Sequence, residues 1–439
     1  MHWSAPVSFG GNAGTLLSPV PTSNFGASRY MSSPDAYQRR REIGRRVAYW
    51  RSRRGLTRQQ FADLVGRSVS WVDKIESGER ALLRLPLLEQ VAEVLHVGVE
   101  ALTDKAAADR AATCVDPAEV QAIRAALSKY PGLLAQGTEV VPVSAIRSQA
   151  DYLEHAWLAS RFMVVAGHLP KLMADAQYAL YAVPPEKKID AYRVLVTTYR
   201  LASSMLLKFE VNDVAWLAAD RAIHTALQVD DTWSLARATR SVARAMSSGR
   251  HQSEAITALL AMGDRMRAET NANEHDLLAL YGMLYLAASI TAAGQEDAGL
   301  ARDMHGEALA AAQRFQPHYH DHYTLFGMTN VLIHRVSALV RLYQPGQALE
   351  FAAGIDPGSV AALSAERQAN FLLDLTEAHA TTGNHQQAAA LLAQAERIAP
   401  EEVRCRPLAH SLLRSLLETT RGSSAQLVKQ MATRAGIDA

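Results

Sequence analysis

The sequence predicts an all-α protein in two parts, a compact five-helix domain followed by a long array of paired helices. Its 439 residues are rich in Ala, Leu, Arg and Glu and only 7% are aromatic, which favours helices throughout. Between residues 56 and 78, two short amphipathic segments flank a glycine turn, each with a capping residue before it. From about residue 144 onward, small residues recur as they do where paired helices cross. No part of the chain is typical of a strand-rich domain.

Composition divides the chain into four segments. Residues 1–36 are rich in Gly, Ser, Pro and Asn and lack apolar periodicity, so we expect a disordered tail. Met31 stands just ahead of the folded region, and a native start there is an alternative. We expect the five-helix domain in residues 37–104, a helical linker in 105–143 and the helical array in 144–439.

The five-helix domain is centred on two helices joined by a tight turn. Thr57 can cap a helix that starts at about Arg58, and Gln60 can complete a capping box with it. Gly66 supplies the turn, and Ser68 can cap the second helix. The other helices expected in this domain span residues 39–53, a segment beginning near residue 86, and residues 99–102.

The apolar positions of these two helices predict how they pack. Phe61, Ala62 and Val65 share one face of the first helix, and Val72 and Ile75 of the second point back towards it. The small Ala62 leaves room for a close crossing. The residues left facing outward are candidate base readers: Val69, Ser70, Asp73 and Lys74.

Charge is concentrated in the same region. Residues 38–84 hold thirteen Lys or Arg and five Asp or Glu, a net charge of +8, whereas the whole chain carries +1. Such a local positive field suits the release of counterions from DNA phosphates. This charge argues against two alternatives. One is a domain that no longer binds DNA, and the other is a basic helix that only faces solvent.

Residues from about 38 to 104 resemble the λ-repressor-like, or Xre-type, helix-turn-helix domain. The resemblance rests on Leu-Thr, Gln, Ala, Gly, Ser, Ile-Glu and Gly at matching places within residues 56–78. It implies a phosphate contact for Arg58 and a second helix that lies in the major groove. The DNA-binding residues that we predict are Arg58, Arg67, Ser68, Val69, Ser70, Trp71, Lys74 and Arg80.

The resemblance also carries one structural expectation and two departures. It implies that Glu76 pairs with Arg51 of the opening helix and so holds the fold together. Arg67 stands where the family usually buries an aliphatic residue. Val69 and Ser70 stand where longer amide side chains often read adenine. The departures affect the expected base preference and leave the expected fold unchanged.

The linker and the array predict helices throughout. Asp116, Pro117 and Glu119 provide a cap, a first-turn proline and an acid for a helix that ends at about Tyr130, before a Pro-Gly pair. About six helical pairs should follow, with corresponding alanines 40 to 50 residues apart. The array therefore resembles a degenerate tetratricopeptide (TPR) domain. Its clearest repeat is marked by Leu372, Leu375, Gly383, Ala388, Leu392, Ala395 and Pro400.

The first helix of each pair should form the concave wall of the array, where a ligand would bind. Arg237, Arg240 and Arg244 are three and four residues apart and share one helical face. A solvated face is the alternative interpretation of this arginine set. Amide side chains in successive repeats could pair with the backbone of an extended peptide. The ligand-binding residues that we predict are Arg200, Arg237, Arg240, Arg244, Asn330 and Asn370.

Other chemistry is weakly indicated. His318, His320 and His322 could share one side of an extended loop, but we predict no metal site or cofactor there; a pH-responsive loop is an alternative. Cys114 and Cys405 lie far apart in sequence, which predicts neither a disulfide framework nor a metal site. No phosphate-binding Gly-Lys loop, nucleophile elbow or zinc-protease motif occurs, so we do not expect an enzyme.

The combined architecture leads to two hypotheses. A repressor-type domain joined to a TPR-like array resembles the peptide-pheromone (quorum-sensing) receptors of Gram-positive bacteria and the helix-turn-helix/TPR regulators of actinobacteria, and the composition favours the second group. We expect a homodimeric transcriptional regulator that binds double-stranded DNA and senses a peptide or small molecule. The alternative is a DNA-bound scaffold that recruits a protein partner without a small ligand. With no apolar run of membrane-spanning length expected, we predict a cytoplasmic bacterial protein, at the nucleoid when bound to DNA.

Overall fold

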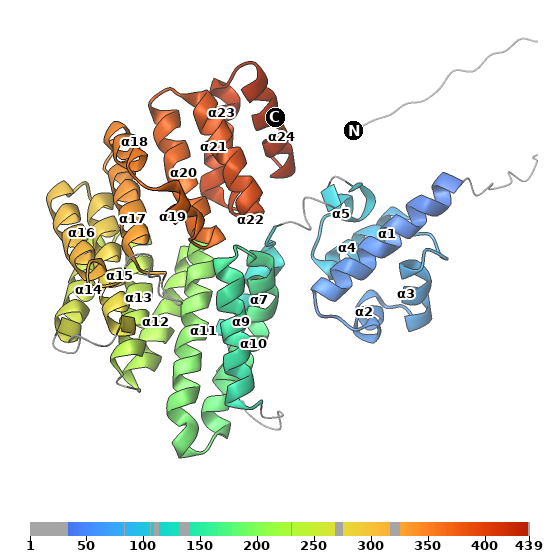
Figure 1. Cartoon of the computed structure of the whole chain (residues 1–439). Coiled ribbons are helices and arrows are strands. Elements are labelled where there is room, and N and C mark those ends of the chain that lie inside the picture. The colour runs from blue at the N-terminus through green and yellow to red at the C-terminus, as the bar shows by residue number, and fades with distance from the viewer. Residues whose placement is uncertain are drawn as a thin grey trace, which may run out of the picture.

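A computed structural model describes most of the chain, and every regular element in the described part is a helix (Figure 1). The residues described are 34–82, 84–105, 107–108, 114–130, 141–229, 231–267, 275–316 and 325–437. Residues 1–33 of the predicted tail lie outside them, and so does the loop with the three histidines.

The N-terminal domain contains five helices, and its local signals act as predicted. The Thr57 hydroxyl accepts a hydrogen bond from the Gln60 amide at 3.2 Å, and the Gln60 side chain accepts one from the Thr57 amide at 2.9 Å. Gly66 ends its helix in the left-handed region at φ 66°, and Ser68 caps the next one. The five helices are α1 (Pro34–Arg53), α2 (Arg58–Val65), α3 (Val69–Glu76), α4 (Leu85–Leu95) and α5 (Val99–Thr103).

One core joins these five helices. Trp50, Phe61, Val72 and Ile75 are buried together, which confirms the predicted inward faces of α2 and α3. Gly44 of α1 lies against the end of α3: a Cβ atom there would be 2.2 Å from the carbonyl oxygen of Ile75. The backbone of α1 therefore supports α3 directly and fixes its direction.

Seven helical pairs follow in the described part of the array, after a linker helix α7 (Pro117–Leu127) that packs on α10. A short 3-10 turn, η1 (Pro185–Lys187), precedes α11, and the short helices α19 (Pro357–Ala361) and α22 (Pro400–Arg404) lie between pairs. The pairs are α9 (Val143–Leu158) with α10 (Phe162–Ala182), α11 (Lys188–Lys208) with α12 (Asn212–Leu227), α13 (Thr232–Ser248) with α14 (Gln252–Arg267), α15 (His275–Gly294) with α16 (Ala298–Ala312), α17 (Met328–Arg341) with α18 (Pro345–Ala353), α20 (Ala365–Thr381) with α21 (His385–Ile398), and α23 (Pro407–Thr419) with α24 (Ser423–Arg434).

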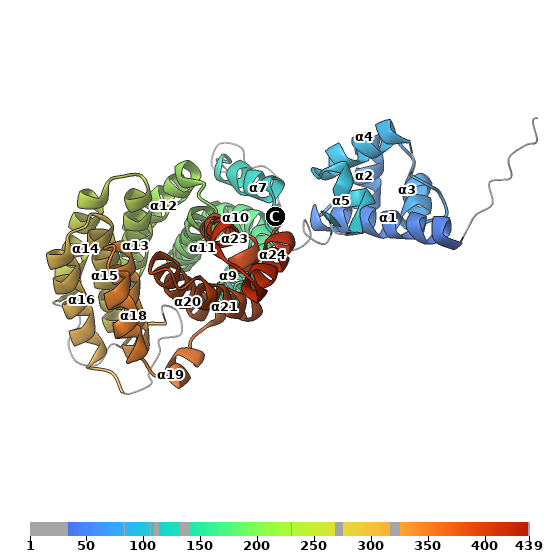
Figure 2. The ribbon, with the colours of Figure 1, turned by 90° about the horizontal axis from the view of Figure 1, so that it is seen from above.

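The array curves until its late helices meet its early ones (Figure 2). Lys208 at the end of α11 donates to Glu366 of α20 at 2.9 Å and to Glu402 of α22 at 2.6 Å. Both carboxylates are almost inaccessible to solvent, and Lys208 also lies over the Trp157 ring. We call Lys208, Glu366 and Glu402 the closure cluster. It is an ionic contact that joins the early helix α11 to the late helices α20 and α22.

Helix α15 corrects one prediction made from sequence. No apolar run was expected to approach membrane-spanning length, yet α15 is long and apolar enough to cross a membrane by those two criteria. Within the described chain, 78% of its most apolar window is buried in the protein. Neighbouring helices cover it on most sides, as in a core helix of a large helical protein.

The N-terminal domain is joined to the ring by charged contacts at the start of α7. Arg53 pairs with Glu119 at 2.8 Å and also donates to the carbonyl of Cys114 at 2.6 Å. Arg54 pairs with Asp116 at 2.6 Å. These four carboxylate and arginine side chains, Arg53, Arg54, Asp116 and Glu119, form what we call the junction.

Candidate functional site

Helix α3 presents a small polar face to solvent, anchored from behind by the core. Ser68, Ser70 and Lys74 are exposed, and Val69 is half-buried against the other helices. Arg67 and Arg80, which flank the helix, are exposed as well. These side chains therefore lie where a DNA duplex could reach them, although their contact with DNA stays a prediction.

Trp71 does not belong to this face. It was predicted as a DNA-binding residue, but it is only 6% exposed and packs in the core with Val72 and Ile75. The inward arc of α3 is wider than its small size suggests, because α1 and α2 both pack around it. The prediction for Trp71 is therefore wrong, and its role is to support the helix.

An ion-pair network holds α3 to the rest of the domain. Arg51 donates to Glu76 at 2.5 and 3.2 Å, which confirms the expected pair. Arg58 also donates to Glu76, at 2.8 Å, and lies 3.1 Å from Asp73. Burial favours a raised pKa for Glu76, but its two arginine partners lower the pKa below its usual value. Arg58, predicted to contact phosphate, is half-exposed and would have to share its charge with these acids.

A second candidate site is the cavity at the centre of the ring, about 840 Å³ in volume. The helices α9, α11, α13, α15, α17 and α20 line it, which are the first helices of their pairs, as the sequence predicted for a concave wall. Eight arginine or lysine side chains and four carboxylates line this cavity, an excess of four positive charges. Its volume falls within the range of small-molecule sites.

Two of the predicted arginines share one carboxylate partner within the protein. Arg200 and Arg237 both donate to the same carboxylate oxygen of Glu154. Arg237 also bonds to Thr197 at 3.2 Å and stacks over the Trp233 ring. Burial, and then the neighbouring Arg237, lowers the pKa of Arg200 to about 9 despite the attraction of Glu154.

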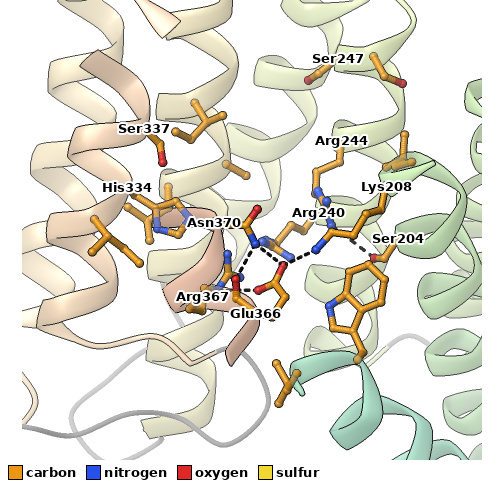
Figure 3. A pocket seen from close by; sticks show the side chains of 18 of the residues that line it. Ser204, Lys208, Arg240, Arg244, Ser247, His334, Ser337, Glu366, Arg367 and Asn370 are labelled. Carbon is orange, nitrogen blue, oxygen red and sulfur yellow. Dashed lines mark hydrogen bonds and ion pairs between the residues drawn. The ribbon is translucent and has the colours of Figure 1, made fainter. Parts of the chain in front are cut away.

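The other two predicted arginines are not neutralised in this way. Arg240 has no hydrogen-bond or ion-pair partner among the residues that the structure describes, and its Nε atom is buried without one. Arg244 has a single, long contact of 3.4 Å with the Ser204 hydroxyl. Burial lowers the pKa of both guanidinium groups, and the closeness of Arg244 lowers that of Arg240 further. Figure 3 shows both side chains reaching from α13 towards Asn370.

The amide residues do not form the expected ladder on the cavity wall. Asn330 is fully buried beside Met283 and does not line the cavity, so its predicted inward position is wrong. Asn370 does line the cavity, but its amide group donates to Glu366 and its oxygen accepts from Arg406 at 2.8 Å. Neither amide is available to pair with a peptide backbone in this arrangement.

The side of the cavity formed by α17 and α20 combines charged groups, Arg341, Glu366 and Arg367, with polar groups whose pKa values are shifted by burial. Burial lowers the pKa of His334 to about 3, which keeps its imidazole neutral. Burial raises the pKa of Asp374 to about 6, although the hydroxyl of Ser337 donates to this carboxyl group and works against the rise. Positive charge therefore lies on both sides of the cavity, from Arg240 and Arg244 on α13 and from Arg341 and Arg367 on α17 and α20.

Sequence reasoning missed several charged residues of the cavity. Lys208, Arg341, Arg367 and Arg406 line it and were not predicted. Arg367 could have been found, because it lies one helical turn before Asn370 and so shares its face. Lys208 could not, because its partners are more than 150 residues away in the sequence.

The two cysteines are neighbours in space, contrary to the separation suggested by sequence. The Sγ atoms of Cys114 and Cys405 lie 2.7 Å apart, and the Cys114 thiol also donates to the carbonyl of Arg404 at 3.3 Å. The contact with Cys114, together with burial, raises the pKa of the Cys405 thiol strongly. In the described ranges no three His, Cys, Asp or Glu side chains form a group that could hold a metal ion.

Comparison with known proteins gives one result. A family model described as a helix-turn-helix domain matches residues 42–106. No curated protein and no solved structure matches the chain. The match supports a helix-turn-helix DNA-binding regulator, and the helical repeats lie outside the matched residues.

Proposed function

We propose that this chain is a dimeric, sequence-specific transcriptional regulator whose helical ring binds a small signal and thereby alters DNA binding. The observation that carries the proposal is the placement of Ser70 and Lys74 on the exposed face of a capped, core-anchored helix. The net charge of +8 around that helix supports attraction to phosphates. Such a regulator would act in the bacterial cytoplasm.

Dimerisation is part of the proposal because one domain of this kind contacts little DNA. Helix α3 is only eight residues long, and three of these are buried. Two such helices on paired half-sites, about 34 Å or one helical turn apart, would add affinity and fix the register. Sedimentation of the full chain with and without DNA tests this part, and a monomer on a single half-site would contradict it.

The route from the cavity to the DNA-binding domain is short in space. Glu402 of the closure cluster belongs to α22, and the carbonyl of Arg404 in that helix accepts a hydrogen bond from Cys114. The carbonyl of Cys114 in turn accepts from Arg53 of the junction. A ligand that favours one geometry of the ring could therefore change where the junction holds the DNA-binding domain.

Selection of duplexes from a random pool by the full-length chain, followed by binding titrations at several salt concentrations, tests DNA reading. The Arg67→Ala/Lys74→Ala variant should lower the slope of log affinity against log salt by about two. Ser70→Ala should relax sequence preference at one position. Lys429→Ala, an exposed lysine on α24, is the control. Unchanged affinity and preference in all variants would refute the assignment of α3.

The alternative of a protein-recruiting scaffold has a different signature. The helical repeats resemble TPR arrays, and their first-helix-inward arrangement supports that assignment and the actinobacterial comparison as proposals. A scaffold would retain a protein partner through purification and would show no thermal stabilisation by small molecules. The charged cavity, of a volume typical of small-molecule sites, favours the small-signal version.

A further inference from the structure

We propose that the cavity binds a small amphiphilic anion, with a carboxylate or phosphate group held by Arg240 and Arg244 and an apolar body lying against α15. This inference rests on the proposed function and names the class of its signal. Nothing in it requires an extended peptide.

The anionic part of the proposal follows from the two unneutralised guanidinium groups. Arg240 and Arg244 are one helical turn apart on α13, and the charge of Arg244 adds to burial in lowering the pKa of Arg240. The other charged residues of this wall have carboxylate partners: Lys208 has Glu366 and Glu402, and Arg237 has Glu154. Glu366 attracts both groups from a distance, but no carboxylate among the described residues is within ion-pair distance of either. Two desolvated positive groups without such a contact are costly, and an anion that accepts hydrogen bonds from both would lower that cost.

The geometry of a guanidinium pair suits a group with several anionic oxygens. Each planar guanidinium presents donors in a fork that matches carboxylate or phosphate oxygens. The buried, unbonded Nε of Arg240 is one donor that such a group would satisfy. The Ser204 hydroxyl, which Arg244 contacts at 3.4 Å, is a further polar group beside the proposed position.

The apolar part of the proposal follows from the next helix of the ring. α15 packs directly beside α13 and lines the cavity with Leu286, Ala287 and Ile290. Ile333 of α17 and Phe371 of α20 continue this surface. His334 stays neutral beside this surface, but Arg341 and Arg367 line the α17 and α20 side as well, so the apolar body is placed against α15.

The amide side chains argue against an extended peptide as the occupant. Recognition of a peptide backbone along a helical array needs free carboxamides at successive positions of the wall. Asn330 is fully buried, and both functions of Asn370 are engaged by Glu366 and Arg406. A compact ligand that uses arginine donors fits the side chains that remain.

Calorimetric titration of the full-length chain with head-group analogues of equal length tests the proposal. The probes are octyl phosphate and octanoate, with 1-octanol, octylammonium and inorganic phosphate as comparisons. We expect binding of the two octyl anions, and weaker or no binding of the other three. Equal binding of octylammonium would overturn the anionic part, and equal binding of inorganic phosphate would overturn the apolar part.

Two variants separate the site from general stability. Arg240→Gln/Arg244→Gln should lower affinity for octyl phosphate by at least about tenfold, the effect of losing charged hydrogen bonds. Its melting temperature without ligand should stay at or above that of the parent chain, because two desolvated charges are removed. The matched control is Arg302→Gln, an exposed arginine on the outer helix α16. Unchanged affinity in the double variant would overturn the proposal.

DNA binding is measured in the same preparations, so that the two proposals can fail separately. Intact binding to selected duplexes without any binding of the octyl anions refutes the ligand class alone. Absence of DNA binding refutes the proposed function, whatever the anions do. A change in DNA affinity on adding octyl phosphate, lost in the arginine double variant, supports both.

Discussion

Replacing Lys208 with methionine should open the ring, because this lysine neutralises two buried carboxylates. Its side chain is 5% exposed, and those of Glu366 and Glu402 are 8% and 0% exposed. Removing one partner of a buried ion pair typically costs about 3–5 kcal/mol, since the remaining charge stays desolvated. For a domain of this size, such a loss lowers the melting temperature by roughly 10 °C.

The pH dependence gives this prediction a direction. Burial alone would raise the pKa of Glu366, but Lys208, Arg367 and Arg406 together hold it well below its usual value. In the parent chain, this carboxylate therefore contributes stability above about pH 4.5, and the contribution is lost as the pH falls further. Without Lys208, burial prevails and the pKa rises, so acidification protonates Glu366 and relieves the variant. The difference in melting temperature should shrink below about pH 5.

Thermal unfolding between pH 4.5 and 8 and small-angle scattering measure the two effects. The variant should show a larger radius of gyration at pH 7 if the closure cluster holds the ring together. Lys171→Met is the control, because its pair with Asp175 is an exposed contact within α10 and should be worth less than about 1 kcal/mol. A Lys208→Met chain as stable and compact as the control would refute the reasoning.

Two further predictions concern the DNA-binding domain and the linker. Gly44→Ala should destabilise the domain by about 1–3 kcal/mol and abolish DNA binding, because the new Cβ would overlap a carbonyl of α3. Gly306→Ala, whose Cβ would meet nothing within 4 Å, is the neutral control in unfolding titrations. Diamide, which takes two hydrogens from a thiol pair, should link Cys114 to Cys405 within one chain, as 2.7 Å between their sulfur atoms allows. Peptide mass analysis of the non-reduced digest measures this, and cross-links only between chains would contradict the fold.

Local chemistry made the helix-turn-helix predictable. The caps at Thr57 and Ser68 and the left-handed glycine at residue 66 act on neighbours within a few positions, so the sequence alone indicates them. The exposed or buried state of a residue in a two-turn helix depends on what packs around it. Trp71 was therefore misplaced, because only the packing of α1 and α2 on α3 shows how wide the buried arc is.

The ring could be predicted only in part. Periodic small residues indicated paired helices with an inner wall, and the arginine face on α13 was found by its three-and-four spacing. In a degenerate repeat, the sequence predicts the presence of helical pairs better than it predicts which residues of each helix face inward. Asn330 was assigned to the inner wall, but it is buried. Ring closure depends on how curvature accumulates over many repeats, and no local pattern encodes that sum.

Ring closure also explains why charge is distributed as it is. An open array would leave Glu366 and Glu402 near solvent, where they would need no lysine, and Arg240 would be solvated and would need no anion. Closing the ring desolvates all of them together, and the protein supplies a partner for the carboxylates but none for Arg240. The proposed anion would supply the contact that Arg240 lacks among the described residues. An anion that binds the closed ring more tightly than an open array shifts the equilibrium towards the closed ring. The difference between the two binding free energies is the energy available to move the junction.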